Sequence, residues 1–333
     1  MQIFKTPNFD FIRWRWHALA LSALVIGAGM FLIATRGLQK GVDFEGGTIV
    51  ILKFAEAPDF NRITGALGGD AVVQQYGKPE NRDVSIRVKS VGEESGMNLS
   101  NEVDRVISTL KAANVGAFDE KPVKTSVVGP VVGEQLRRQG LWATGLAMAG
   151  ILVYIALRFQ FSFAAGAVVA TVHDLLVCLA FLAFFRYDMT LNVVAGLLTI
   201  TGYSVNDTIV IFDRVRENMR GMRRDNLTTI VNTAVNQTLS RTVITAGTTA
   251  LSVLALYVFG GEVLEGFAFT MLVGIISGTY STVFIASALA ILLQGRKPLK
   301  GQMAGAGAGS VPSPSAAASA SGATRPSKRK KVS

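Results

Sequence analysis

Two acidic side chains stand inside segments that are otherwise apolar. The first is Asp207, which follows Asn206 within the stretch TITGYSVNDTIVIFDRVREN, residues 199–218. The second is Asp174, which follows His173 near the middle of another apolar segment. An ionised carboxylate at the centre of a bilayer costs at least ~2.5 kcal/mol on insertion scales, so such residues are rare and mark ion or proton pathways. Asp207 and Asp174 are therefore the first candidates for chemistry in this chain.

A guanidinium group is available to act on Asp207. Arg241 heads a helical stripe of hydroxyl side chains, made up of Thr245, Thr248, Thr249 and Ser252. Removal from water favours the neutral acid, whereas a nearby cation favours the carboxylate. If Arg241 alternately approaches and leaves Asp207, that acid would bind and release a proton, and one charge crossing 100 mV yields about 2.3 kcal/mol. The alternative is a static buried ion pair that only fixes the register of two helices.

Enzyme signatures offer no competing interpretation. The sequence contains no HExxH, GxSxG or P-loop motif. A membrane aspartyl protease would pair Asp174 with Asp207, since two close carboxylates can share a proton and activate water, but the GxGD motif of such proteases is missing. Cys178 is the single cysteine, which excludes a disulfide within the chain, and metal-ligand spacing is absent. We expect neither catalysis nor a bound metal or cofactor.

The acidic residues belong to a chain built from membrane helices. Half of the residues are hydrophobic and the mean hydropathy is +0.39. Nearly uncharged runs occupy 17–35, 141–157, 161–185, 190–212, 243–259 and 266–293. Each can cross the roughly 30 Å hydrocarbon core as a helix, the structure that satisfies its own backbone in lipid. The first run follows basic residues as a signal peptide would, but its core is long and no A-x-A-like site follows, so we expect a retained helix.

The distribution of charge predicts the orientation. The chain carries a net charge of +10, yet residues 40–139 are nearly balanced. The excess of Lys and Arg falls in the N-terminal arm (1–16), in a basic loop (213–241) and in the tail (296–333). Because cytoplasmic segments carry such an excess, both termini are predicted in the cytoplasm and residues 36–140 outside. The tail is rich in Gly, Ala and Ser and is predicted to be disordered. Its basic end can contact membrane lipids, and nucleic acid is not expected as the main ligand.

The segment outside the membrane alternates between strand and helix patterns. Strands are predicted at 48–54, 71–76, 83–89 and 122–128, with helices after Asp59, up to Gly68-Gly69, and over Leu99–Leu110. The order βαββαβ is that of the split, ferredoxin-like motif. The predicted fold class is therefore an α-helical polytopic membrane protein with six transmembrane helices. A small α+β domain lies between the first and second of these, and the other five form a bundle at 141–295.

Helical periodicity sorts the polar residues of the spans into faces. At about 100° per residue, one face of the fourth span carries Thr199, Tyr203, Asn206, Asp207, Arg214 and Glu217, with Asp213 at its edge. The opposite side is mostly apolar but includes Thr201, Ser204 and Thr208. In the third span, His173 and Asp174 are expected to point in different directions. In the sixth, a face of small residues at 270–281 is expected to serve helix packing.

Five ordered segments resemble the signatures of a known family. They are GVDFEGGTIV (41–50), VGPVVGEQL (128–136), VHDLLV (172–177), GYSVNDTIVIFDRVREN (202–218) and LSRTVITAGTTAL (239–251). Together they are similar to the SecF family, the smaller partner of SecD in bacterial protein export. The resemblance runs from about residue 3 to residue 297 and leaves out the low-complexity tail.

The resemblance implies a function in the bacterial inner membrane. SecD and SecF together are similar to one RND-type transporter split into two halves of six spans. The expected partners are SecD, the SecYEG translocon and unfolded exported polypeptides, with YajC and YidC as further candidates. The energy source would be the proton gradient, without a bound cofactor.

The resemblance also assigns residues. The functional aspartate of the family matches Asp207 and its arginine matches Arg241, while Asn206 and Asp213 belong to the same blocks with less defined roles. Asp174 remains a further proton-coupling candidate from its position in the membrane. In the first block, Gly41, Asp43, Gly46 and Gly47 are expected to be structural.

Two other functions remain open from the sequence. A single chain with six spans could form a homodimeric RND-type exporter of small molecules. Alternatively, the chain could be a passive scaffold that stabilises the translocon without proton work.

Overall fold

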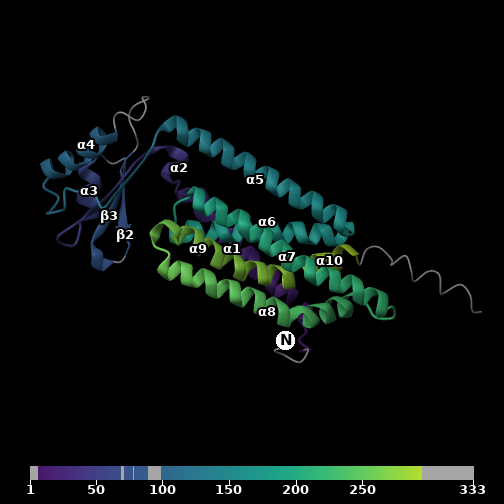
Figure 1. Cartoon of the computed structure of the whole chain (residues 1–333). Coiled ribbons are helices and arrows are strands. Elements are labelled where there is room, and N and C mark those ends of the chain that lie inside the picture. Colours follow the sequence, from purple (N-terminus) through teal and green to yellow (C-terminus); the bar gives the residue numbers. More distant parts are fainter. Residues whose placement is uncertain (1–6, 69–70, 78, 89–98, 295–333) are drawn as a thin grey trace, which may run out of the picture. The chain divides into compact units, whose positions relative to one another are not determined.

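The structure is a computed structural model that describes residues 7–68, 71–77, 79–88 and 99–294. The predicted disordered tail, 296–333, and Gly69 lie outside these residues. Within the described part, six helical segments are long and apolar enough to cross a membrane, which confirms the expected fold class (Figure 1). The small sheet domain is inserted between the first and second of them.

The membrane helices are longer than the apolar runs. After the turn η1 (Ile12–Trp14), they are α1 (Arg15–Arg36), α5 (Pro130–Arg158), α6 (Phe161–Phe185), α7 (Leu191–Gly221), α8 (Leu227–Phe259) and α9 (Glu262–Ser281). The last span continues through the π-helical turn η3 (Thr282–Ala286) into α10 (Ser287–Gln294). The expected loop at 213–241 is wrong as a description of local structure, because α7 and α8 extend through it and leave only residues 222–226 between them. The reason is that both α7 and α8 continue as amphipathic helices beyond their apolar runs.

The outer domain has the predicted order of elements. After the short helix α2 (Val42–Glu45), it contains β1 (Gly47–Lys53), α3 (Phe60–Ala66), β2 (Val72–Tyr76), η2 (Pro79–Asn81), β3 (Asp83–Val88), α4 (Leu99–Ala112) and β4 (Lys124–Val128). The strands lie in the antiparallel order β2-β3-β1-β4, with Val50 opposite Ile86. Asp59 caps α3 by accepting from the backbone N–H groups of Asn61 and Arg62, as the sequence predicts. Val50, Leu52 and Ile86 are buried in the core between this sheet and helices α3 and α4.

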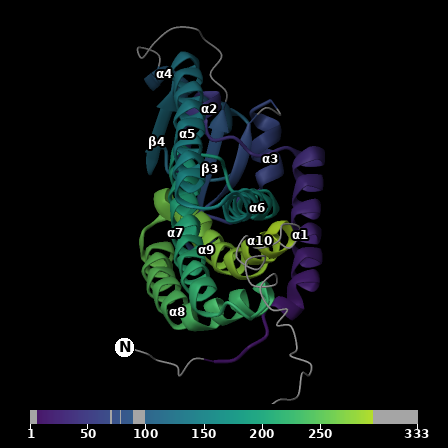
Figure 2. The same cartoon turned by 90° about the vertical axis from the view of Figure 1, so that its right-hand side faces the viewer.

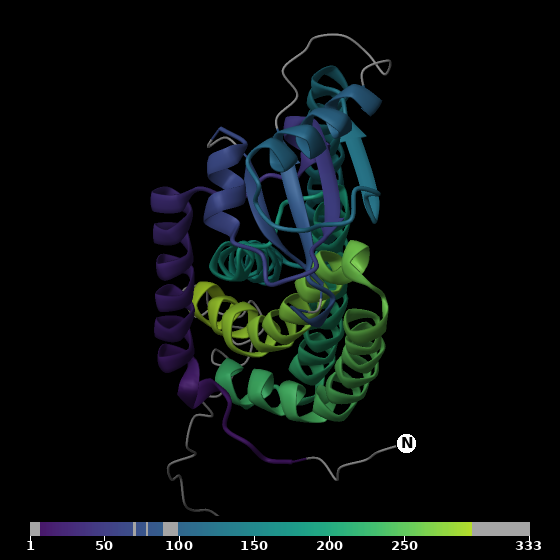
Figure 3. The same cartoon turned by 90° about the vertical axis from the view of Figure 1, so that its left-hand side faces the viewer.

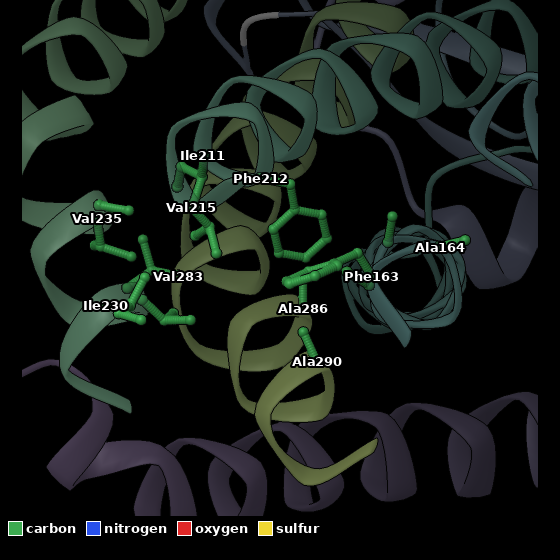
Figure 4. Packing of buried hydrophobic residues seen from close by; sticks show 14 of the residues in the cluster. Phe163, Ala164, Ile211, Phe212, Val215, Ile230, Val235, Val283, Ala286 and Ala290 are labelled. Atoms are coloured by element: carbon green, nitrogen blue, oxygen red, sulfur yellow. The ribbon is translucent and has the colours of Figure 1, made fainter. Parts of the chain in front are cut away.

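The membrane helices are arranged around α6, α7 and α9. Helix α6 contacts α1, α7 and α9, and α8 contacts α7 and α9. Figures 2 and 3 show α1 and α8 on opposite sides of this central group. At the end of the group that is predicted to face the cytoplasm, α5, α6, α7, α8, α10 and the turns η1 and η3 share an apolar core. Figure 4 shows Phe212 of α7 against Phe163 of α6, and Val283 of η3 near Val235 of α8. This core holds in place the parts of α7, α8 and η3 that surround Asp207.

Candidate functional site

Asp207 lies inside the contact between α7 and α8. Its side chain is 7% exposed, and its Oδ1 atom accepts a hydrogen bond from the Thr242 hydroxyl at 3.0 Å. Thr242 is itself 1% exposed, so the pair is shut off from the surroundings of the bundle. The sequence placed Asp207 on a protected face, but it did not identify Thr242. The one signal for Thr242 is that it directly follows Arg241.

Arg241 does not close an ion pair with Asp207 in this structure. Its side chain is exposed on α8, and among the described residues no salt bridge within 4.0 Å joins the two groups. Arg241 and Thr242 are consecutive, so they project from α8 about 100° apart. The hydroxyl therefore occupies the inward position beside the carboxyl, and the guanidinium lies on the outer surface of the same turn. The predicted partner of Asp207 is therefore not in direct contact with it in this structure.

The neighbouring helices cover only part of the polar face that the sequence predicts on α7. Asp207 is buried, whereas Thr199 and Asn206 are exposed on the surface of the bundle. Nearer the C-terminal end of α7, Arg214 donates to Gln237 of α8 at 2.7 Å and to Glu217 at 2.5 Å. Asn206 therefore does not join Asp207 in a common site within this chain.

Asp174 is the centre of a second buried site. Its carboxylate is 1% exposed and accepts hydrogen bonds from the hydroxyls of Ser204 (2.6 Å), Ser277 (2.6 Å) and Ser281 (2.7 Å). These donors come from α7 and α9, while Asp174 itself lies on α6. A buried polar group is costly unless it is hydrogen-bonded, and here both carboxylate oxygens have hydroxyl partners. Asp174 thus connects three helices at the centre of the bundle.

His173 extends the Asp174 site to a fourth helix. Its Nδ1 atom lies 3.1 Å from Asp174 Oδ1, and its Nε2 atom lies 2.9 Å from the hydroxyl of Ser22 on α1. The sequence did not predict this contact between consecutive residues. Apart from it, the two side chains reach different helices, since His173 meets Ser22 on α1 whereas Asp174 is bonded by serines of α7 and α9. The ring also stacks on Tyr280 of α9, with centroids 6.1 Å apart.

The small residues of α9 have two separate functions. Gly274 and Gly278 allow close packing, because an added Cβ atom would lie 2.1 Å from Cγ1 of Ile200 and 3.2 Å from Cβ of Ser204. Ser277 and Ser281, from the same stripe, donate to Asp174 instead. The packing interpretation from sequence is therefore right for the glycines and incomplete for the serines. Ser204 was assigned to the apolar side of its span because helical periodicity does not show which hydroxyl meets a carboxylate.

Asp213 lies apart from both buried carboxyl groups. Both of its oxygens accept from Nη2 of Arg158, at 2.9 and 3.0 Å, and the two side chains are 40% and 39% exposed. This ion pair joins the end of α5 to α7. An exposed pair of this kind contributes only ~0–1 kcal/mol, and the geometry gives it no contact with Asp207.

The GVDFEGG block joins the outer domain to the start of α7. Gly41 donates its N–H to the carbonyl of Met189 at 2.7 Å, and an added Cβ would lie 2.6 Å from that oxygen. Gly46 and Gly47 have φ values of 71° and 127°, which side chains disfavour. Asp43 accepts a hydrogen bond from the N–H of Leu191, the first residue of α7, at 2.9 Å. The block therefore positions the helix that carries Asp207.

Replacing Asp43 by Ala is expected to lower the free energy of unfolding by ~1 kcal/mol, because an N–H group at the start of α7 loses its acceptor. Asp43→Asn keeps a carbonyl oxygen and should retain most of the stability. The measurement is the unfolding midpoint of the purified protein in detergent. Equal midpoints for the Ala and Asn variants would show that the contact with Leu191 does not stabilise the fold.

The acidic groups of the described residues are not clustered as metal ligands. Among the described residues, no group of three or more His, Cys, Asp and Glu side chains is arranged to hold a metal ion. The hydroxyl of Thr242 can donate to a carboxylate or accept from a protonated acid by rotating about its C–O bond. Asp207 therefore has a partner in either protonation state.

Comparison with known proteins agrees with this architecture. Residues 107–296 match the family described as protein export membrane protein SecD/SecF, C-terminal, and residues 31–57 match the SecD/SecF GG motif. Protein translocase subunit SecF of Magnetococcus marinus is 44% identical over 298 residues, covering 88% of this chain and 94% of that protein. The subunit of the same name from Desulfurispirillum indicum is 40% identical over 293 residues, covering 86% and 92%.

A solved structure shows the same fold in a longer chain. The crystal structure of SecDF, a translocon-associated membrane protein from Thermus thermophilus, matches with a TM-score of 0.76 at 30% identity. The match covers 88% of this chain but only 40% of the SecDF chain. A second structure, SecDF in a super-membrane-facing form, matches with a TM-score of 0.64 at 31% identity. From the family match, the related subunits and the six-span bundle, the chain belongs to the SecD/SecF family of protein-export membrane proteins, as a SecF-like subunit of the Sec machinery.

Proposed function

We propose that this chain acts with SecD to promote late steps of polypeptide translocation through SecYEG, driven by the proton gradient. The observation that carries the proposal is the placement of Asp207. Its carboxyl group is buried among membrane helices and accepts a hydrogen bond from the neutral hydroxyl of Thr242, and the residue directly before Thr242 on α8 is Arg241. Rotation or sliding of α8 would exchange Thr242 for Arg241 beside the acid and so change its affinity for protons.

The proposed surface for SecD is the exposed polar face of α7 and α8. Thr199 and Asn206 of α7 and Arg241, Thr245 and Thr248 of α8 are exposed there. The threonine hydroxyls bond to carbonyl groups of their own helices, for example Thr245 to Arg241 O at 3.0 Å. Among the described residues, the Arg241 guanidinium and the Asn206 amide make no such hydrogen bond to a carbonyl group of their own helix. Polar side chains within spans usually face protein or water. A second six-span subunit covering this face would supply that environment. The SecDF chains, which are longer than this one, support SecD as the partner.

We propose the further protein partners from the family membership and the orientation in the membrane from the distribution of charge. We include SecYEG and the unfolded exported polypeptide as functional partners, with YajC and YidC as accessory partners. The chain would lie in the bacterial inner membrane with both termini in the cytoplasm, since its excess of Lys and Arg falls on that side. The outer domain would then meet the polypeptide as it emerges.

Replacing Arg241 by Met is expected to remove most of the gradient-dependent part of export, because a thioether cannot stabilise the ionised form of Asp207. The assay measures export into membrane vesicles with and without an imposed proton gradient, at equal amounts of the SecD–SecF complex. Arg216→Met is the matched control, since Arg216 is an exposed arginine near the end of α7. Full gradient-dependent export by Arg241→Met would contradict the proposal and favour a passive scaffold.

Co-purification separates the proposal from the homodimeric exporter. A stoichiometric complex with a second, different six-span protein supports the export subunit. A homodimer that confers resistance to small molecules, without SecD, would support the exporter instead.

A further inference from the structure

The N-terminal arm is bound to α8 through its backbone. Asn236 accepts from the N–H of Phe9 at 2.9 Å and donates to the carbonyl of the same residue at 2.8 Å. One helical turn earlier, Asn232 accepts from the N–H of Phe11 at 3.0 Å and donates to the carbonyl of Phe9 at 2.9 Å. Two side-chain amides thus satisfy both backbone groups of Phe9, much as a neighbouring strand would.

The spacing explains why this arrangement fits. Residues four apart on a helix lie on the same face, about 6 Å apart along the axis. Asn232 and Asn236 therefore both face the arm, in which Phe11 begins the turn into η1 with φ −65° and ψ −38°. Asparagine offers a donor and an acceptor in one planar group. Aspartate would lose the donors to the Phe9 carbonyl, and an aliphatic residue would lose both.

The arm connects α8 to the other helices of the cytoplasmic core. Ile12 is buried in the cluster that includes Val231 of α8 and Val283 of η3. The ring of Phe11 meets Phe284 of η3 edge to face, with centroids 6.1 Å apart. The chain then continues directly into α1. Figure 3 shows the purple segment before α1, which begins at residue 7, passing below the base of the bundle.

Helix α8 is buried most deeply at this end. Towards the outer side, many of its apolar side chains are exposed, including Leu251, Val258 and Phe259. Its buried residues are concentrated between Ile230 and Thr242. Asn236 lies six residues before Thr242, the partner of Asp207. The turn η3, held by the arm on one side, contributes Thr282, which contacts the hydroxyl of Thr208 at 3.0 Å. The arm therefore braces both segments that contact the Asp207–Thr208 turn.

From these contacts we infer that Asn232 and Asn236 are positioning residues for Asp207: by binding the N-terminal arm they hold α8 so that Thr242, rather than Arg241, faces the acid. This inference rests on the proposed function and extends it to regulation of the same site. The charged and titratable groups on the surrounding elements include Arg241 on α8, Arg214 and Glu217 on α7, the Arg158–Asp213 pair joining α5 and α7, His173 and Asp174 on α6, Tyr280 on α9, and Asp10 and Arg13 in the arm. Among these, Arg241 is the group whose position α8 controls.

The test uses the full-length chain in its complex with SecD. The double variant Asn232→Leu/Asn236→Leu keeps side-chain size but removes the amides. We expect the pH midpoint of gradient-driven export to move by about 0.5 unit or more, since Arg241 gains access to Asp207. We also expect roughly tenfold faster hydrogen exchange of the backbone amides of 227–242, because the helix loses its tether. A change in protein amount alone would not move the pH midpoint.

A second pair of variants leaves α8 untouched. Phe11 has φ −65°, the value that proline adopts, so Phe11→Pro fits the backbone while removing the N–H that bonds to Asn232. Phe11→Ala loses the same ring but keeps that N–H. Faster exchange in α8 and a shifted pH midpoint should therefore be larger for Pro than for Ala. This pair decides the question even if the double variant does not accumulate in the membrane.

The outcomes separate this inference from the proposed function. Unchanged exchange in α8 in the double variant, or equal effects of Phe11→Pro and Phe11→Ala, would overturn the tether. Faster exchange with an unchanged pH midpoint would overturn the link to Asp207. If Asp207→Asn supports full gradient-driven export, the proposed function fails, whatever the arm variants do to the exchange of α8.

Discussion

Replacing Asp207 by Asn is expected to abolish the gradient-dependent part of export while leaving the complex assembled. The amide is nearly the same size and can still accept from Thr242, whose hydroxyl lies 3.0 Å from Oδ1, so the contact between α7 and α8 is kept. It cannot bind and release a proton at the pH of the membrane. Each proton that crosses 100 mV yields about 2.3 kcal/mol, which is roughly fiftyfold in an equilibrium constant. Losing that contribution should be evident in the assay.

The measurement is the rate of export in vesicles with and without an imposed gradient, normalised to the amount of assembled complex. Asp225→Asn provides a matched control, because Asp225 is an exposed carboxylate in the short connection between α7 and α8. Its gradient response should equal that of the parent. A normal gradient response in Asp207→Asn would show that the protein supports export without proton exchange at this residue.

Removing the carboxylate of Asp174 is expected to have the largest effect on stability. Asp174→Ala leaves Ser204, Ser277 and Ser281 without their shared acceptor in a site that is 1% exposed. A buried hydrogen-bond donor left unsatisfied costs ~1–3 kcal/mol. Ser281 already has a second acceptor, the carbonyl of Gly278 at 3.2 Å, and this limits its loss. We expect a total loss on the order of 3 kcal/mol, because the packing of α6 against α7 and α9 loses its polar centre.

Thermal unfolding of the purified complex in detergent would measure this loss. Asp174→Asn should unfold much closer to the parent, since its carbonyl oxygen still accepts and the serine hydroxyls can turn to meet its amide. Asp225→Ala controls for removal of an exposed carboxylate. An Asp174→Ala variant as stable as the parent would mean that the serine cluster contributes nothing to helix packing. Whether Asp174 also exchanges protons stays a prediction, to be tested by the gradient response of Asp174→Asn.

Local sequence patterns predicted much of the fold. The length of the apolar runs predicted six spans because lipid leaves the helix as the structure that satisfies its own backbone. Alternation and capping predicted the βαββαβ order, and Asp59 caps α3 as expected. The helices at 213–241 were missed because α7 and α8 continue beyond their apolar runs, where polar and charged residues lower the hydropathy. The sequence also singled out Asp207 and Asp174, since a carboxyl group in an apolar run is costly wherever the run is packed.

The sequence by itself determined the number of spans, the type of the outer domain and the acids that need a partner, because these depend on the composition and period of single segments. Only the tertiary structure decided which groups contact these acids and the N-terminal arm. It placed Thr242 rather than Arg241 beside Asp207, gathered three serines and His173 around Asp174, and joined the backbone of Phe9 to two asparagines of α8. Each of these contacts crosses from one helix or segment to another. Their geometry depends on how neighbouring helices are rotated and packed, and that is set by the whole bundle rather than by any one stretch of chain.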